Sequence, residues 1–214
     1  MIFKYQFVNH DAELLHELAK HIVLDIWCNA SGNFTIDLIT EDNDFRKKVN
    51  RTGTYLKAPI EEIFNICKNF NSQQKNYIKN AFNKNNQIED LCNNSISPIF
   101  YDDIKRATSE DFSKNVKTFF NNLYEEVFNQ KPFFINKHYD DFFKVNRRLC
   151  PFCGIKTLEK DSSNHRDAYD HYLPKEKYPF NAVNLKNLLP MCSDCNEKWK
   201  KTKNPIFKEN MKKS

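Results

Sequence analysis

Two cysteine pairs constrain the fold of the last third of this chain more than any other feature. Cys150 and Cys153 form one C-x-x-C pair, and Cys192 and Cys195 form the other. Four thiolates at this spacing are the ligand set of a tetrahedral structural Zn²⁺ site, which leaves no coordination position open to substrate or water. We therefore expect a structural zinc ion that holds both ends of the 38-residue segment 154–191. Because a plain zinc ribbon has roughly 15 to 20 residues between its pairs, the longer segment indicates an insertion.

The other cysteines and the apolar segments indicate a protein of a reducing compartment. The chain has seven cysteines, and C-x-x-C pairs in such a compartment favour metal binding over disulfides. The first residues do not resemble a secretory signal. The most apolar stretch, 22–27, is interrupted by Asp25 and falls far short of the roughly 20 residues that span a membrane. We expect a soluble, cytoplasmic protein in which Cys28, Cys67 and Cys92 are buried as small hydrophobic residues.

Positive charge is concentrated in the cysteine-bearing third. From Lys144 onward the chain has sixteen Lys or Arg and eight Asp or Glu, whereas residues 1–143 have seventeen and twenty. Clustered basic charge is typical of a polyanion-binding surface, although a solvated basic face has the same composition. The chain has only three glycines, which excludes the glycine-rich phosphate loops of common nucleotide-binding folds.

The residues before the cysteines predict helices. Apolar side chains recur every three or four residues over 10–28 and over 110–130, which is the spacing of an amphipathic helix. Pro59 and Ser72 mark two further helix starts. Alternating apolar residues over 34–38 predict one short strand.

These patterns predict a mainly α protein with two parts. Apolar residues make up 40% of the chain and aromatic residues 14%, which is enough for a buried core. Helical periodicity gives way to the cysteine pairs between Lys131 and Arg148. We therefore expect an N-terminal helical domain over 1–143 and a small, zinc-stapled C-terminal module over 144–214.

Three polar residues of the cysteine-bearing part suggest chemistry in addition to a zinc clamp. Asp170 and His171 lie adjacent in the inserted segment, and Asn196 follows directly after the last cysteine. Carboxylate and amide oxygens are ligands suited to Mg²⁺ or Mn²⁺ rather than to zinc. Histidine, with an ordinary pKa of about 6.5, is suited to taking a proton from water near neutral pH.

The order of these motifs resembles the HNH nuclease family in its four-cysteine, ββα-metal form. The resemblance covers about residues 148–203 and consists of C-x-x-C, Asp-His, Asn-Leu five residues before a cysteine, and C-x-x-C-Asn. It implies that His171 activates a water molecule and that Asp170 and Asn196 hold one catalytic Mg²⁺ or Mn²⁺. It also implies that Asn187 orients the histidine.

The resemblance further implies a fold and a substrate. We expect one strand with Asp170 and His171, a second strand around 188–191, and a helix that begins near Ser193 or Asp194. The implied activity is hydrolysis of phosphodiester bonds, with DNA as the usual substrate of the family and RNA not excluded. The lysines expected to hold the nucleic-acid backbone are Lys175, Lys177, Lys198, Lys200, Lys201 and Lys203.

A narrower resemblance is carried by the sequence of segment 166–175, R-x-A-Y-D-H-Y-L-P-K. It is similar to HNH nucleases of bacterial anti-phage systems, including Septu and retron-associated types. Such nucleases work beside an ATPase subunit, so the helical domain is a candidate docking surface for that partner. Two features depart from the pattern. Trp199 stands where many relatives have a lysine, and the third family position is Asn rather than His, which favours metal ions that prefer oxygen ligands. His165 and Asp167 lie close by and are alternatives to the assigned ligands, although the polarity of a loop also explains both.

Two alternatives to a nuclease remain open. A non-catalytic zinc ribbon that binds nucleic acid or protein explains the cysteines and the basic charge equally well. An inhibitory or assembly subunit with a decayed nuclease fold is the other. The placement of Asp170, His171 and Asn196 discriminates between these alternatives and a nuclease, because a pure binding module has no physical reason to bring those side chains together.

Overall fold

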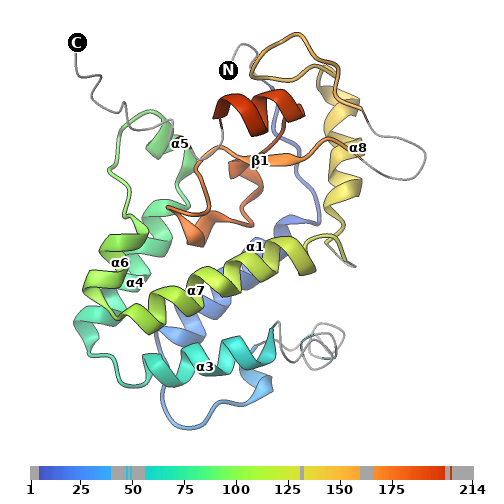
Figure 1. Ribbon diagram of the computed structural model, residues 1–214. Coiled ribbons are helices and arrows are strands. Elements are labelled where there is room, and N and C mark those ends of the chain that lie inside the picture. The colour runs from blue at the N-terminus through green and yellow to red at the C-terminus, as the bar shows by residue number, and fades with distance from the viewer. Residues whose placement is uncertain are drawn as a thin grey trace, which may run out of the picture.

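Helices make up most of the protein before the first cysteine pair, as the computed structural model shows (Figure 1). The structure describes residues 5–39, 56–130, 133–159 and 166–200, together with single residues at 47, 49 and 203. The helical elements of this part are α1 (Glu13–His21), η1 (Ile22–Trp27), η2 (Ile36–Leu38), α3 (Lys57–Cys67), α4 (Ser72–Asn85), α5 (Ile88–Cys92), α6 (Tyr101–Ala107), α7 (Glu110–Asn122), η3 (Leu123–Val127) and α8 (Ile135–Val145). The prediction of a mainly helical protein is confirmed. Among the described helices, none has the length and apolar character needed to cross a membrane.

The two long amphipathic segments form the centre of the helical part. The helix expected over 10–28 is α1 continued by η1, and the helix expected over 110–130 is α7 continued by η3. Ser109 caps α7, because its side chain accepts a hydrogen bond from the backbone N–H of Phe112. Trp27 of η1 is fully buried, and its ring lies 5.1 Å from that of Phe119 on α7. The apolar stripes read from the sequence therefore face each other in the core.

Two expectations for the helical part are wrong. Segment 34–38 is not a strand, because residues Ile36–Leu38 form the short 3₁₀ helix η2. Its backbone is satisfied locally, with N–H of Leu38 donating to the carbonyl of Thr35 at 3.1 Å, so it needs no partner strand. Cys92 is exposed at the end of α5, whereas Cys28 and Cys67 are buried as expected. The short helix α5 buries only its other face.

The cysteine-bearing part contains the two strands and the helix where we expected them. Strand β1 (Tyr169–His171) pairs antiparallel with β2 (Leu188–Pro190), and Asp170 lies opposite Leu189. The short helices η4 (Pro179–Asn181) and η5 (Leu185–Asn187) lie between the strands, and η6 (Asp194–Lys200) follows them. In Figure 1, β1 lies between α7 and the red turns of the C-terminal part.

The main hydrophobic core runs through both parts of the chain. Residues after position 144, including Tyr169 and Phe180, belong to the same buried cluster as the helices. The ring of Phe180 lies 5.6 Å from that of Phe82 and 5.5 Å from that of Phe120. A second, smaller cluster consists of Cys150, Leu158, Met191, Cys192 and Cys195. The segment between the strands is thus packed against the helical part, while the cysteines have a core of their own.

Candidate functional site

The four paired cysteines lie close enough together to hold one metal ion. The sulfur atoms of Cys150, Cys153, Cys192 and Cys195 all lie within 4.8 Å of one another, and those of Cys153 and Cys192 are 4.0 Å apart. Tetrahedral coordination with Zn–S bonds of about 2.3 Å requires sulfur atoms about 3.8 Å apart. The cluster therefore fits a structural metal ion such as zinc.

The first cysteine turn is held by backbone hydrogen bonds. Gly154 donates from its N–H to the carbonyl of Cys150 at 2.8 Å, with a φ of 68°, a conformation that glycine adopts without strain. Hydrogen bonding from the backbone N–H groups, first that of Lys156 and then that of Ile155, lowers the pKa of Cys153 to about 7. The turn thus favours the thiolate, which is the form that binds a metal ion.

The second cysteine turn leads directly into η6. The backbone N–H of Asn196 donates to the carbonyl of Cys192 at 3.0 Å. The carboxylate of Asp194 forms ion pairs with Lys156 of the first turn and with Lys198, the latter at 2.6 Å. These two lysines hold the pKa of Asp194 at about 2. The start of η6 is therefore tied to both cysteine turns.

His171 ends β1 with its ring orientation determined by one hydrogen bond. Its Nε2 lies 2.8 Å from the carbonyl oxygen of Ala182. Because a carbonyl only accepts, Nε2 carries the proton and Nδ1 carries the lone pair. Burial, together with the positive charge of Lys175 and Lys200, lowers the pKa of His171 to about 3. The imidazole is therefore neutral near pH 7, which is the form able to accept a proton.

Asp170 is paired with a lysine of η6. Its Oδ2 lies 2.8 Å from Nζ of Lys200, and the two side chains are only 8% and 9% exposed. The same Nζ donates to the backbone carbonyl of His171 at 2.6 Å. Burial raises the pKa of Asp170, and the Lys200 ammonium opposes that shift. An ammonium group therefore neutralises the carboxylate next to the histidine.

Asn196 lies on the same face of η6 as Lys200. The two residues are four positions apart and both are partly buried, whereas the intervening residues 197–199 are exposed. Side chains four positions apart lie near one another on a helix. Lys200, on this less exposed face of η6, contacts Asp170 and the backbone carbonyl of His171.

The buried side chain of Asn187 hydrogen-bonds two loops to each other. Its Oδ1 accepts from the N–H of Leu173 at 2.7 Å, and its Nδ2 donates to the Leu173 carbonyl at 3.1 Å and to Oδ1 of Asn181 at 3.1 Å. The residue has no solvent exposure. It therefore holds the backbone that follows His171 against the loop that contains Ala182, and acts on the histidine through the backbone of both segments.

The last residue of α4 and the residue that follows it hold that same loop. Nδ2 of Asn181 donates to the Asn85 carbonyl at 3.2 Å, and Nδ2 of Asn184 donates to Oδ1 of Asn86 at 3.0 Å. Asn86 also donates to the Phe180 carbonyl at 3.3 Å. The helical part of the protein thus determines where the carbonyl that binds the histidine ring lies.

Three of the lysines expected to bind nucleic acid are already paired with acidic groups. Lys175 lies 2.6 Å from Glu125 and over the ring of Tyr124, with 4.9 Å between its Nζ and the ring centroid. Lys198 and Lys200 pair with the two aspartates described above. Of these three, Lys198 is the most exposed, so its ion pair is the easiest for a phosphate group to displace.

The remaining candidate residues divide between surface positions and positions that the structure leaves undescribed. Lys177 and Lys203 are exposed. Asp167 accepts a hydrogen bond from a backbone N–H through its Oδ2, at 3.0 Å, which gives it a structural role in its loop. Lys201 and His165 lie outside the described residues.

The contacts of Tyr124 and Lys200 with this site were not predicted. The ring of Tyr124 lies 4.5 Å from that of His171, edge to face, although the two residues are far apart in the sequence. No pattern in the chain signals that contact. The four-residue spacing of Lys200 from Asn196 could have indicated that both lie on one face of the helix.

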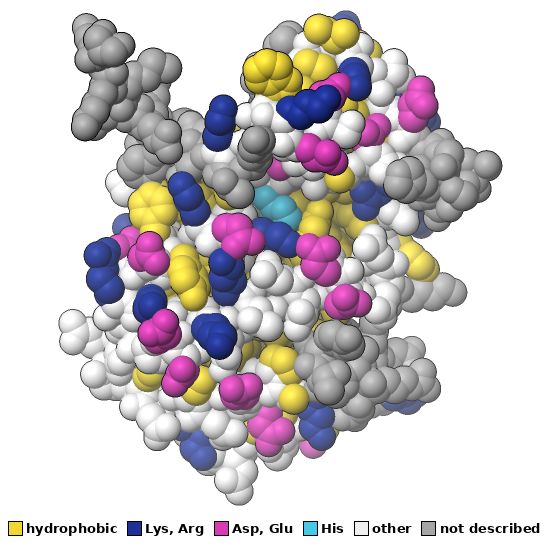
Figure 2. Space-filling model, viewed as in Figure 1, with side chains coloured by type: hydrophobic (Ala, Val, Ile, Leu, Met, Phe, Trp, Pro, Cys, Tyr) yellow, Lys and Arg dark blue, Asp and Glu magenta, His cyan; other side chains and the backbone are white. Residues whose placement is uncertain are grey.

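Figure 2 shows a histidine side chain at the surface between the cysteine-bearing part and the helical part, among Lys, Arg, Asp and Glu side chains.

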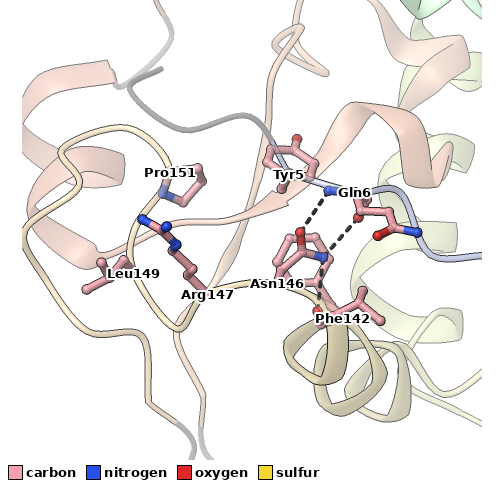
Figure 3. Close-up of a pocket in the computed structure, with 8 residues that line it drawn as sticks. Tyr5, Gln6, Phe142, Asn146, Arg147, Leu149 and Pro151 are labelled. Carbon is pink, nitrogen blue, oxygen red and sulfur yellow. Dashed lines mark hydrogen bonds between the residues drawn. The ribbon is translucent and has the colours of Figure 1, made fainter.

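A separate cavity of about 390 Å³ lies where the first described residues meet the end of α8 (Figure 3). Gln6 donates from its N–H to Oδ1 of Asn146 at 2.8 Å, and Asn146 donates back to the Gln6 carbonyl at 2.9 Å. The ring of Tyr5 lies 5.4 Å from that of Phe142. The described residues of the lining include no histidine and no carboxylate, so they offer neither a proton acceptor nor a metal ligand of these kinds. Its contacts join the N-terminal segment to the helix that leads into the first cysteine pair.

Comparison with known proteins gives one partial similarity. No family model matches this chain, and no solved structure matches it. Protein ea31 of Escherichia phage lambda is 36% identical over 74 residues, which are 35% of this chain and 23% of ea31. The match therefore spans less than a quarter of the length of that relative.

Proposed function

We propose that this protein is a metal-dependent HNH endonuclease that hydrolyses phosphodiester bonds of DNA. The observation that carries the proposal is the state of His171, whose Nε2 is bound to the Ala182 carbonyl at 2.8 Å. This bond leaves the Nδ1 lone pair as the proton acceptor of a neutral imidazole. In this proposal the oxygen ligands of the catalytic ion come from Asp170, adjacent to His171 on β1, and from Asn196, which follows the second cysteine turn.

In the proposed reaction Nδ1 of His171 takes a proton from the attacking water, while Nε2 keeps its bond to Ala182. The low pKa of about 3 belongs to the free protein, in which burial and two nearby lysines disfavour the imidazolium. A phosphodiester brings negative charge to the histidine, and negative charge favours the protonated ring. Binding of substrate therefore raises the basicity of His171 at the step that needs it.

Asp170 and Asn196 would hold the Mg²⁺ or Mn²⁺ ion, since carboxylate and amide oxygens suit these cations. When bound, such an ion polarises a phosphate oxygen and stabilises the leaving oxygen. Lys200 has to release Oδ2 of Asp170 before that oxygen becomes a ligand, because the two atoms are 2.8 Å apart. The released ammonium group is then free to contact a phosphate.

The cysteine cluster and the helical part supply rigidity in this proposal. The cysteine turns hold the start of η6, and Asn85 and Asn86 at the C-terminal end of α4 hold the loop that orients the histidine. The role in bacterial anti-phage defence, and the docking of an ATPase subunit on the helices, are predictions that depend on the sequence resemblance alone.

One observation favours a second candidate, a non-catalytic zinc module that binds nucleic acid or protein. The carboxylate expected to bind the catalytic ion is already neutralised by Lys200, and both side chains are almost fully buried. A structural ion pair has this arrangement too. The two candidates differ in whether the protein cuts the nucleic acid it binds.

Incubation with supercoiled plasmid in Mg²⁺ or Mn²⁺ tests the proposal. We expect the natural protein to nick and linearise the plasmid, and His171→Gln to lose about 10²- to 10⁴-fold in rate, the usual contribution of a general base. Glutamine keeps a donor for the Ala182 carbonyl, so folding and zinc content should be retained. His21→Gln is the matched control, because His21 is an exposed histidine of α1 paired with Asp25.

Two results would contradict the proposal. If His171→Gln cuts as fast as the natural protein, His171 is not the base. If the natural protein binds DNA and RNA but cuts neither in any divalent ion, the non-catalytic zinc module is the correct interpretation.

A further inference from the structure

A second cavity, of about 410 Å³, borders the cysteine cluster and the proposed catalytic site. Phe152 and Cys153 line it from the first cysteine turn, and Cys195 and Trp199 line it from the second turn and η6. Lys200 and Lys203 complete the lining. The volume lies within the range of small-ligand pockets, roughly 300 to 1,000 Å³. An apolar, aromatic recess thus opens between groups that carry positive charge.

Trp199 is the exposed aromatic residue of this recess. Its side chain is 71% exposed, on a helix whose other outward residues are charged. The second tryptophan of the chain, Trp27, is completely buried and bonded to a backbone carbonyl. An indole is large and apolar with a polar edge, so when exposed beside a cavity it suits a flat ligand better than water.

We propose that this cavity binds an unpaired nucleobase of the nucleic-acid substrate, stacked on Trp199. The inference rests on the proposed function and specifies the substrate class as nucleic acid with a single-stranded region at the cavity. An aromatic wall offers a stacking surface to any base. Lys203, which is exposed, offers a contact to a neighbouring phosphate, and the described residues of the lining include no carboxylate to repel it.

Lys200 connects this cavity to the proposed catalytic residues. Its side chain lines the cavity, and its Nζ reaches Asp170 and the backbone carbonyl of His171. When a base occupies the cavity, the phosphate of the same nucleotide therefore lies near Lys200, whose Nζ contacts the backbone carbonyl of His171. In a duplex both faces of each base are covered by neighbouring bases, so only an unpaired or extruded base can enter.

Tryptophan fluorescence tests this inference without any cleavage. Because Trp27 is buried and Trp199 is exposed, the long-wavelength emission reports on Trp199. The natural protein is titrated, without added divalent ions, with a short oligothymidylate and with a blunt duplex of equal length. We expect saturable quenching by the single strand and much weaker quenching by the duplex.

Substitutions identify the source of the affinity. Since stacking of one base on an aromatic ring contributes about 1–3 kcal/mol, Trp199→Ala should weaken binding of the single strand about 5- to 150-fold. Trp199→Tyr should retain most of the affinity. The salt dependence should be unchanged in Trp199→Ala and reduced in Lys203→Ala, because only the lysine contacts phosphate. Zinc content should be the same in all variants.

Several outcomes would overturn the inference. They are equal affinity of Trp199→Ala and the natural protein for the single strand, equal quenching by single strand and duplex, or no quenching by any nucleic acid. The last result would show that the cavity binds no nucleobase. A protein that binds the single strand through Trp199 but never cuts would refute the proposed nuclease and leave this inference standing. A protein that cuts normally after Trp199→Ala and binds as before would refute this inference alone.

Discussion

Replacement of Lys200 by methionine removes the positive charge next to Asp170 while keeping most of the side-chain volume. In the natural protein the two charged groups are 2.8 Å apart and at most 9% exposed. Without the ammonium group, the Asp170 carboxylate is buried and unneutralised. Loss of one partner of a buried ion pair costs about 3–5 kcal/mol. For a chain of this size, about 2–4 °C per kcal/mol, the melting temperature should fall by about 6–20 °C near neutral pH.

The cost of Lys200→Met should depend on pH in a direction that the pKa of Asp170 determines. Burial raises this pKa above its value in the unfolded chain, and removal of Lys200 removes the main opposing effect. A carboxyl group with a raised pKa contributes stability below its unfolded pKa, and that contribution is lost as the pH rises through the folded pKa. The difference between the variant and the natural protein should therefore be small near pH 4 and largest above neutral pH.

Lys198→Met on the same helix is the matched control. Lys198 pairs with Asp194 at 2.6 Å, but the two side chains are 72% and 31% exposed, so solvent screening should make the loss of this pair far less costly than the loss of the buried pair. Thermal unfolding followed by circular dichroism, with zinc present, measures both variants. The double variant Asp170→Asn with Lys200→Met should recover most of the loss, because it buries no charge. Equal melting of the two single variants, or no recovery in the double variant, would refute the reasoning.

Two further predictions concern the metal ion and the buried histidines. Cys195→Ser should abolish the binding of one zinc ion per chain, measured by atomic absorption, and retention of that ion would contradict the site. The variant should also expose the two cysteine turns, near 150–158 and 191–200, to proteolysis while most helical signal remains, because the cysteines have a core separate from that of the helices. Burial lowers the pKa of His16 and of His138 to about 4, so each stabilises the fold above its unfolded pKa and loses that contribution as the pH falls. Urea unfolding should show a loss of about 2 kcal/mol per histidine between pH 7 and pH 5, and His16→Gln should flatten this dependence; an unchanged slope would contradict it.

The sequence predicted the features that depend on neighbouring residues. The spacing of apolar residues predicted α1, η1, α7 and η3, because residues on one face of a helix recur every three or four positions along the chain. The cysteine spacing predicted a four-sulfur cluster, and the motif order located β1, β2 and η6. The prediction of a strand over 34–38 was wrong because alternation of apolar and polar residues favours a strand only when another strand lies beside it.

The tertiary contacts of the candidate site residues could not be predicted from neighbouring residues in the sequence. Asp170, His171 and Asn196 could be named from the chain, but their partners could not. The Ala182 carbonyl that sets the tautomer of His171, and the ring of Tyr124 beside it, come from segments that no local pattern connects to β1. Lys200 was expected to hold nucleic acid, yet it forms a buried ion pair.

The sequence by itself therefore identified the residues whose chemistry suits metal binding or proton transfer. These are the four cysteines, one histidine and one aspartate, with basic charge around them. The tertiary structure decided their states. It placed His171 where burial keeps it neutral, joined Lys200 to Asp170, and held the loop between the strands against the C-terminal end of α4. Burial and the partner of a charged group arise only when distant segments pack together, which is why these states cannot be read from the order of the residues.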